Sequence, residues 1–338
     1  LRLDIELYRE RELEVVILDE AQNIKNPEAQ VSRAAFRLPG THRFALTGTP
    51  IENSVKDLWS IMNFVMPGYL GERSQFVDRF EKPLARGDAP ELQRRLARRL
   101  KPVILRRLKE EVAKDLPEKI EQVRYCELSD SQRQVYNSIL EESRGMIYDA
   151  EGGRRRMLAL TALLRLRQAC CDLRLLNLPG VDEEGGSVKM EELKGLLEEA
   201  VAGGHRVLVF SQFVQMLQGI VPVLMEKGFE FCYLDGQTRK RGEVVRRFQE
   251  SSVPVFLISL KAGGVGLNLT GADTVIHVDP WWNPAVEAQA TDRAHRIGQK
   301  RVVTSYRLIT RNTVEEKILA LQERKRKLIA STLDKDVS

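Results

Sequence analysis

The feature that most constrains the fold is a regular alternation of strand-length and helix-length segments in the second half of the chain. Apolar, β-branched segments predict strands at residues 207–210, 231–234, 255–259, 274–278 and 303–308. Amphipathic segments around them predict helices at residues 191–202, 213–227, 241–250 and 313–328. This alternation predicts a doubly wound α/β domain around a parallel sheet, in which ligands bind at the carboxyl ends of the strands.

The first part of the chain carries a shorter pattern of the same kind. Residues 15–19 and 43–47 predict two buried parallel strands, and polar residues follow each of them directly. A helical pattern begins after the second strand, near residue 54. Residues 70–175 are then predicted to be mostly helical, with a loop at the glycine pair 152–153.

Composition excludes several classes of protein. With 43% hydrophobic and 30% charged residues, the chain is neither fibrous nor disordered in character. The four cysteines and four histidines lack the spacing of metal ligands or of a disulfide framework, so we expect buried thiols. The apolar runs are too short to cross a bilayer, and the first residues carry no signal-peptide pattern. These features predict an intracellular protein that does not act at a membrane.

Positive charge is concentrated in two short stretches, although the formal net charge is only +5. The first stretch covers residues 94–109 and the second covers residues 154–167. Either stretch alone fits a solvated helix face. Two such stretches in one region of the chain favour a surface that faces a polyanion.

Two carboxylates follow the first predicted strand. At a strand end, Asp19 can hold Mg²⁺ through water and Glu20 can orient an attacking water. An acidic strand end is more often a turn or a helix cap, so this pair alone is a weak signal. Residues 46–50 (LTGTP) strengthen it, because small hydroxyl side chains after a second buried strand suit a sensor of the acidic site.

Two arginines lie in the later half of the chain. Arg293 and Arg296 have i, i+3 spacing, which would place them on one face of a helix. The planar guanidinium group binds the oxygens of a transferring phosphate in a bidentate manner. The alternative is an exposed helix whose arginines form salt bridges.

Taken together, these segments resemble the motifs of the Swi/Snf-type ATPases in helicase superfamily two. In the first half, the resemblance lies in motif II (residues 19–27), motif III (46–53) and the family's arginine-rich segment (104–112 with 116–119). In the second half, it lies in motif IV (209–213), the next phosphate-contacting motif (233–238), motif V (259–269) with its extension (279–284), and motif VI (289–299). The motifs occur in the family's order, which makes the combination highly specific.

The resemblance implies an α/β fold with two RecA-like, parallel-sheet lobes and an inserted helical region. Residues 1–68 would form a partial lobe one and residues 188–338 a complete lobe two. Residues 69–187 would form the helical insertion and a linker, which we place at residues 175–187 because Pro179 and several glycines gather there.

The resemblance also implies an ATP-dependent double-stranded DNA translocase that remodels or displaces DNA-bound proteins, such as nucleosomes or RNA polymerase. Its cofactors would be ATP and Mg²⁺, and the motor would be monomeric. Residues 17–27 are more similar to bacterial members, which would place the protein in the cytoplasm, at the bacterial nucleoid. A eukaryotic member would be nuclear.

Carried over by position, the resemblance assigns roles to individual side chains. The catalytic set is Asp19, Glu20, Arg293 and Arg296, in which Asp19 and Glu20 also hold Mg²⁺ through water. The nucleotide-binding set is Gln22, Thr47, Gly48, Gly264, Gly266, Gln289 and Asp292. The DNA-binding set is Ser211, Gln212, Thr238, Lys261, Asn268 and Trp282. Trp281 is expected in the core, whereas Trp282 fits either a core position or a DNA contact.

The sequence departs from the family in one respect. No G-x-x-x-x-G-K-[ST] loop, which cradles the phosphates of a nucleotide, occurs in the chain. We therefore expect lobe one to be truncated before motif II, its motif III strand to be a bare edge, and ATP hydrolysis by the chain alone to be negligible. Two alternatives stay open: a non-catalytic module that binds DNA or protein, and a strand-separating helicase.

Overall fold

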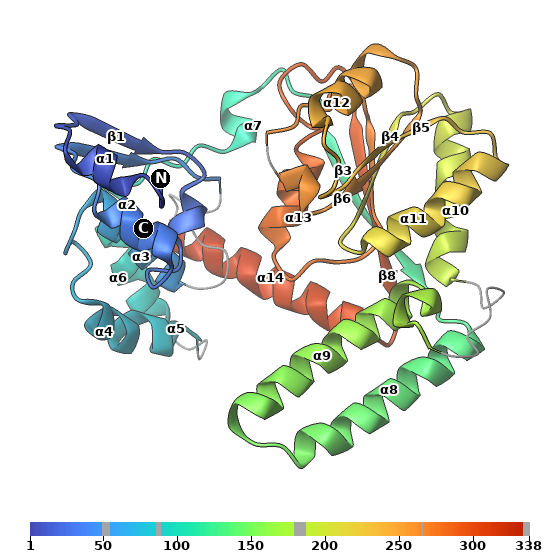
Figure 1. Ribbon diagram of the computed structural model, residues 1–338, viewed down its shortest axis with the longest axis horizontal. Helices are drawn as coiled ribbons and strands as arrows, with labels where there is room; N and C mark the ends of the chain where they lie inside the picture. Colours follow the sequence, from blue (N-terminus) through green and yellow to red (C-terminus); the bar gives the residue numbers. More distant parts are fainter. Residues whose placement is uncertain (49–54, 86–88, 179–186, 265, 334–338) are drawn as a thin grey trace. The chain divides into compact units, whose positions relative to one another are not determined.

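The chain forms two compact units. The computed structural model describes residues 1–48, 55–85, 89–178, 187–264 and 266–333 (Figure 1). Unit 1 comprises residues 1–107 with 324–338, and unit 2 comprises residues 108–323. The predicted division at residues 68 and 187 concerns homologous domains and does not coincide with these compact units. It stays a prediction.

Unit 1 contains a two-stranded parallel sheet. β1 (Val15–Leu18) pairs with β2 (His42–Ala45). The prediction that both strands are buried is wrong for one face of the sheet. On the other face, α2 (Gln30–Phe36) and α3 (Val55–Val65) pack against the strands and bury Val16. The side chains of the open face are 49–57% exposed: Val15, Ile17, Phe44 and Leu46.

The remaining helices of unit 1 are short. They are α1 (Ile5–Arg9), η1 (Ala21–Ile24), α4 (Arg73–Phe76), η2 (Val77–Glu81), α5 (Lys82–Ala85) and α6 (Pro90–Leu100). Phe76, Phe80 and Leu96 form a core with the buried residues of α3. Pro90 begins α6, at the position where its missing N–H leaves no helix hydrogen bond unmade.

Unit 2 is built around a six-stranded parallel sheet with the order β3-β8-β7-β4-β6-β5. The strands are β3 (Lys119–Cys126), β4 (Val207–Ser211), β5 (Phe231–Leu234), β6 (Val255–Ser259), β7 (Thr274–His277) and β8 (Val303–Thr310). In register, Val207 of β4 lies opposite Val255 of β6 and Thr274 of β7. β4, β6 and β7 are buried along their whole length, which explains their continuous apolar sequence. The predicted parallel α/β domain is confirmed.

Helices cover both faces of this sheet (Figure 1). α10 (Val188–Ala202) and α11 (Val214–Glu226) share a core with one face. α12 (Arg241–Glu250) and α13 (Pro284–Thr291) share a core with the other. The short η4 (Ala262–Gly264) follows β6. The predicted helix at 313–328 is confirmed as α14 (Val314–Leu333).

The strand β3 was missed by the sequence-based prediction, which placed it in a mostly helical region. It is an edge strand that pairs only with β8 within the described sheet, Lys119 opposite Val303. Most of its side chains are exposed or half-buried, so it lacks an apolar run. Its pairing depends on backbone hydrogen bonds to a segment far away in the sequence, which local patterns do not reveal.

A helical hairpin belongs to unit 2. α8 (Asp130–Tyr148) and α9 (Gly152–Cys171) run side by side and join at one end (Figure 1). The loop predicted at residues 152–153 lies slightly earlier, because α9 begins at Gly152 itself, which has a φ of +53°. The other short helices of unit 2 are α7 (Lys109–Val112) and η3 (Leu173–Leu176).

The four cysteines are buried and free, as predicted: Cys126, Cys170, Cys171 and Cys232. Burial raises the pKa of Cys126 to about 11 and the pKa of Cys170 to about 12. Over the described ranges, we find no helix with the length and apolar character needed to cross a membrane.

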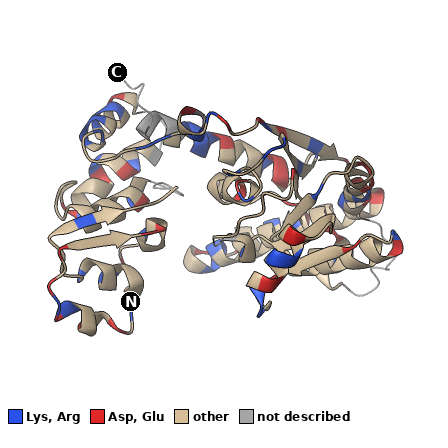
Figure 2. Ribbon diagram, turned by 90° about the horizontal axis from the view of Figure 1, so that it is seen from above, with Lys and Arg blue, Asp and Glu red and all other residues tan. Residues whose placement is uncertain are grey.

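The two basic stretches do not form simple basic surfaces. Acidic residues are interspersed with basic ones over much of the chain (Figure 2). In α6, Glu91 lies 3.0 Å from Arg94 and 3.9 Å from Arg98. In α9, Arg154 is exposed but Arg167 is buried. The second stretch is therefore split, and the prediction that it faces a polyanion as one surface is wrong for Arg167.

Candidate functional site

In unit 1, the acidic pair lies at a sharp turn directly after β1. Glu20 has a φ of 49° and a ψ of 48°, in the left-handed region that a residue with a Cβ adopts at a cost. The turn is held by the backbone N–H of Glu20, which donates to Asp19 Oδ1 at 2.9 Å. The N–H of Ala21 donates to the carbonyl of Leu46 at 2.9 Å. Motif II is therefore fixed against the residue that follows β2.

A chain of side-chain hydrogen bonds links the predicted motifs II and III. Gln22 Nε2 donates to Glu20 Oε2 at 2.6 Å, and Thr47 Oγ1 donates to Gln22 Oε1 at 2.7 Å. The structure thus brings together Glu20, Gln22 and Thr47, all of which were predicted at one site. Gly48 follows at the end of the described segment, and the rest of motif III, residues 49–53, lies outside the described residues.

The acidic pair fits the way Mg²⁺ is held in nucleotide sites. Asp19 is exposed, and its Oδ2 has no partner among the described residues. Mg²⁺ commonly takes one or two carboxylates and completes its shell with phosphates and waters. Across the described ranges, no group of three or more side chains could enclose a metal ion without such ligands. Asp19 and Glu20 therefore fit an ion that arrives with a nucleotide.

In unit 2, the two predicted arginines lie side by side but not on a helix. α13 ends at Thr291, so the expectation of a shared helix face is wrong. The chain turns after Thr291, and both guanidinium groups reach the same carbonyl. Arg293 Nη1 lies 3.4 Å and Arg296 Nη1 lies 3.5 Å from Leu267 O, in motif V. Arg293 is buried and Arg296 is exposed.

The turn that carries these arginines is held by buried polar side chains. Gln299 Nε2 donates to the carbonyls of Thr270, Ala272 and Ala294, and Gln299 Oε1 accepts from two backbone N–H groups. Asp292 accepts from Lys109 at 2.7 Å, while Gln289 lies half-buried on α13. Asp292 therefore has an ion-pair partner within unit 2, and its predicted nucleotide role stays a prediction.

The glycine positions of motif V differ in whether backbone conformation or close packing requires a glycine. Gly266 has a φ of +58°, which favours glycine, and Gly264 ends η4. The glycine that packing demands is Gly263, which the sequence did not single out: a Cβ there would lie 2.9 Å from Phe210. Lys261 and Asn268, on either side of these glycines, are exposed, as a role in binding a ligand requires.

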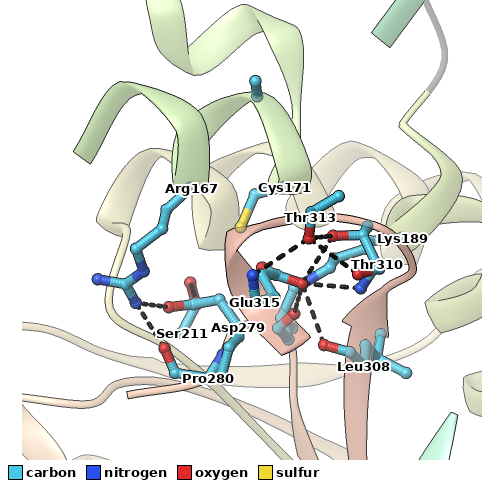
Figure 3. Close-up of polar contacts among 12 residues, drawn as sticks. Arg167, Cys171, Lys189, Ser211, Asp279, Pro280, Leu308, Thr310, Thr313 and Glu315 are labelled. Atoms are coloured by element: carbon cyan, nitrogen blue, oxygen red, sulfur yellow. Dashed lines mark hydrogen bonds and ion pairs between the residues drawn. The ribbon is translucent and has the colours of Figure 1, made fainter. Parts of the chain in front are cut away.

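The predicted DNA-binding residues at the end of β4 divide into a buried and a half-buried one. Ser211 is 1% exposed; its hydroxyl donates to Asp279 Oδ1 at 2.6 Å and accepts from the N–H of Phe213 (Figure 3). The Ser211 hydroxyl is thus used inside the protein, and the place of this residue near DNA phosphates stays a prediction. Gln212 is half-buried and lines a cavity of about 350 Å³ together with Lys261.

The remaining two predicted DNA-binding residues are Thr238, which lies in a turn, and Trp282, which lies beside a cavity. Thr238 Oγ1 accepts from the N–H of Asp235 and donates to Asp235 Oδ1, which closes the turn after β5. Trp282 is half-buried and lines the same cavity as Gln212. Trp281 packs against the core of its face, as expected.

A second buried group, missed by the sequence, lies next to this edge (Figure 3). Lys189 and Glu315 are fully buried, and Lys189 Nζ donates to Glu315 Oε1 at 2.8 Å and to the carbonyls of Val278 and Leu308. Burial alone would lower the pKa of Lys189, but the Glu315 carboxylate outweighs burial and the pKa is raised. No local signal distinguished this lysine from the many exposed ones.

The fold is α/β, with parallel sheets of the RecA-like kind. Residues 1–175 match the family model of the SNF2-related domain, and residues 188–298 match that of the helicase conserved C-terminal domain. The chain belongs to the SNF2 family of ATP-dependent helicases, within helicase superfamily two.

Relatives in several organisms agree with this assignment. A Mycoplasma pneumoniae protein that is named as an ATP-dependent helicase is 40% identical over the whole chain, and the Bacillus subtilis protein YwqA, named as an ATP-dependent helicase/translocase, is 42% identical over 93% of it. The chain covers 32% and 35% of these two relatives, so it spans about a third of their length. The Sulfolobus solfataricus SWI2/SNF2 ATPase core in complex with dsDNA is 38% identical, with a TM-score of 0.55 over 98% of this chain and 72% of that one.

The meeting of the two half-sites stays a prediction. Asp19 and Glu20 belong to unit 1, whereas Arg293 and Arg296 belong to unit 2. Asp19 and Glu20 follow the carboxyl end of β1, the edge at which a nucleotide binds in folds of this class. Arg293 and Arg296 lie instead between the end of α13 and the start of β8.

Proposed function

We propose that this chain is part of an ATP-dependent motor that moves along double-stranded DNA and displaces proteins bound to it, in a bacterial cell at the nucleoid. The observation that carries the proposal is the convergence of Arg293 and Arg296 on Leu267 O, beside the motif V loop. Two adjacent guanidinium groups suit the developing charge of a transferring phosphoryl group. The solved relative that is named as a complex with dsDNA supports duplex DNA as the track.

In this proposal, the acidic edge of unit 1 performs the other half of the chemistry. Glu20 orients the attacking water, and Gln22 fixes the Glu20 carboxylate through the 2.6 Å hydrogen bond. Asp19 holds Mg²⁺ through water, and the ion, when bound, neutralises charge on the phosphates. Thr47 links this carboxylate to motif III through Gln22. Hydrolysis would therefore be sensed at both strand ends of unit 1.

The proposal is tested in the full-length protein that contains this chain. Arg296→Ala is expected to lower DNA-stimulated ATP hydrolysis by about 10³-fold or more, as loss of an arginine finger does. Duplex affinity should stay nearly unchanged. Arg301→Ala is the matched control, because Arg301 lies in the same segment but pairs with Asp273 at 2.9 Å. ATP hydrolysis that survives in Arg296→Ala would contradict the assignment.

For the 338-residue chain by itself, we propose duplex binding without ATP turnover. The observation that favours this is the lack of a G-x-x-x-x-G-K-[ST] loop in the printed sequence. Affinity for duplex DNA should fall linearly on a log–log plot against salt, with little dependence on base sequence. ATP turnover above background with the purified chain would show that the nucleotide site is misplaced.

The strand-separating alternative is tested on the same full-length protein. We expect no displacement of a labelled strand from a duplex with a single-stranded tail under conditions that give full DNA-stimulated ATPase activity. Displacement coupled to ATP hydrolysis would assign the protein to the strand-separating class.

A further inference from the structure

Arg167, on α9, is buried at the edge of the sheet where β4 and β7 end (Figure 3). It is 2% exposed. Its Nη1 donates to Gln212 Oε1 at 2.9 Å, and its Nη2 donates to Pro280 O at 2.5 Å and to Asp279 Oδ2 at 3.3 Å. One guanidinium group therefore joins the helical hairpin to the segments that follow two neighbouring strands.

Asp279 extends this connection to the backbone after β4. Its Oδ1 accepts from Ser211 Oγ at 2.6 Å and from the N–H of Gln212 at 3.2 Å. Arg167 thus holds the side chain of Gln212 directly and its backbone through Asp279. Lysine could not make this set of contacts, because its ammonium is a point donor rather than a planar fork.

The hydrogen bond from Arg167 also determines which polar atom of the Gln212 side-chain amide is not used in that contact. Because Oε1 accepts from Nη1, the amide is oriented with its donor, Nε2, away from that bond. Nε2 is shielded from solvent and has no partner among the described residues. What Arg167 contributes to a ligand contact is therefore a fixed orientation of the Gln212 side chain beside the cavity that this residue lines.

The same guanidinium group lies over the aromatic side chains of this edge. Its central carbon is 5.4 Å from the centroid of the Trp282 ring and 5.7 Å from those of Phe213 and Trp281. A cation within about 6 Å of a ring face is attracted by the ring and restricts its motion. Trp282 is therefore held by the group that orients Gln212.

We propose that Arg167 is a positioning residue for nucleic-acid binding by unit 2, acting through the amide of Gln212 and the ring of Trp282. The proposal rests on the proposed function, because it takes the ligand at this edge to be duplex DNA. It assigns the helical hairpin a part in DNA binding although Arg167 itself is buried. A displacement of α9 would change the orientation of both contact residues.

The test is duplex binding by the 338-residue chain, measured by fluorescence anisotropy at several salt concentrations. Arg167→Lys keeps the charge but loses the fork, and we expect affinity to fall about tenfold, the equivalent of one hydrogen bond to a charged group. The salt slope should stay unchanged, because no charge is lost. Arg165→Lys is the matched control on the same helix, where Arg165 is half-buried and lies 4.0 Å from Glu142; it should bind like the wild type.

A double-mutant cycle separates positioning from a general structural effect. If Arg167 acts through Gln212, then Arg167→Lys in a Gln212→Ala background weakens binding less than it does in the wild type. Full additivity of the two changes overturns the proposal. Wild-type affinity in Arg167→Lys, with weakened binding in Gln212→Ala, also overturns it. A wild-type chain that binds no duplex instead overturns the DNA-binding function on which the proposal rests.

A second variant separates the loss of positioning from the misfolding that an unpaired buried charge could cause. Arg167→Met combined with Asp279→Asn removes both charges of the buried pair, so no charge is left unpaired. The variant is first checked for a cooperative thermal transition, and we expect weakened duplex binding in the folded protein. Wild-type affinity in this folded double variant would overturn the proposal.

Discussion

Several buried polar residues of unit 2 have properties that differ from those of the same residues in water. His277, the last residue of β7, is buried, stacks on Phe210 and lies 2.9 Å from Thr291 Oγ1. Burial, followed by the charge of Arg307, lowers the pKa of His277 to about 3. The imidazole is therefore neutral in the folded protein at every pH at which the protein is studied.

Acidification should destabilise the protein through this histidine. A depressed folded-state pKa contributes stability above the unfolded-state value, near 6.5, and the contribution is lost as the pH falls toward about 3. Between pH 6.5 and pH 5 we expect a loss of about 2 kcal/mol from this group. Urea denaturation at the two pH values measures it. His277→Gln, which does not titrate, should lose less stability over this range, and an equal loss in both proteins would contradict the expectation.

The buried pair of Lys189 and Glu315 makes a second prediction at this scale. Lys189→Met leaves the Glu315 carboxylate buried and unpaired, which is expected to cost about 3–5 kcal/mol of unfolding free energy. Lys189→Met with Glu315→Gln removes both charges and should recover much of this loss. Chemical denaturation of the two variants decides between this coupling and two independent, additive losses.

At the scale of residues, the side chains of motifs II and III were easier to predict from the sequence than the buried polar side chains that hold other residues in place. Glu20, Gln22 and Thr47 were predicted at one site, and the structure joins them by hydrogen bonds. The burial of Arg167 and the partner of the Ser211 hydroxyl were not predicted, because the burial of a polar side chain depends on partners that are distant in the sequence, such as Asp279. Motif spacing contains no information about that pairing.

Among the elements, the strands with apolar runs were predictable and the charged edge strand was not. β4, β5, β6, β7 and β8 were found within a few residues of their predicted bounds because most of their side chains are buried. β3 was missed because its alternation is weak and its partner, β8, is remote. The helix expected at motif VI ends before its arginines, since Gln299 stabilises a turn there.

The open face of β1 and β2 leads to a prediction about association. Ile17 and Phe44 are exposed on it, and exposed apolar sheet surface promotes self-association. Ile17→Thr with Phe44→Thr should reduce association in sedimentation velocity and change unfolding free energy by no more than about 0.5 kcal/mol. Val16→Ala, on the buried face, is the control and should cost about 1–2 kcal/mol. A large stability loss in the threonine variant would show that the face is covered.

At the scale of the whole molecule, the boundaries of the compact units and those of the predicted homologous domains lead to different predictions about which fragment folds. Unit 2 includes the helical hairpin and β3, which contribute Arg167 and one edge of the sheet. We expect residues 108–323, expressed alone, to unfold cooperatively. Residues 188–338, which follow the predicted domain boundary, lack β3 and leave Asp279 without Arg167.

Thermal unfolding of the two fragments tests this expectation. The shorter fragment should be less stable or unfolded, because the edge of β8 loses its partner strand and a buried carboxylate loses its counter-ion. Equal stability of the two fragments would show that the hairpin and β3 are dispensable for folding. The length of the first family match, which ends at residue 175, gives no hint of this dependence.

The burial of all four thiols gives the protein an intrinsic reporter of its own opening. Only the thiolate reacts with alkylating reagents, and pKa values of about 11 and 12 keep Cys126 and Cys170 protonated under ordinary conditions. Labelling of the native protein should therefore proceed only through molecules that have transiently opened. Because the cysteines lie in the sheet and in the hairpin, mass spectrometry of the labelled peptides would time the opening of each region separately.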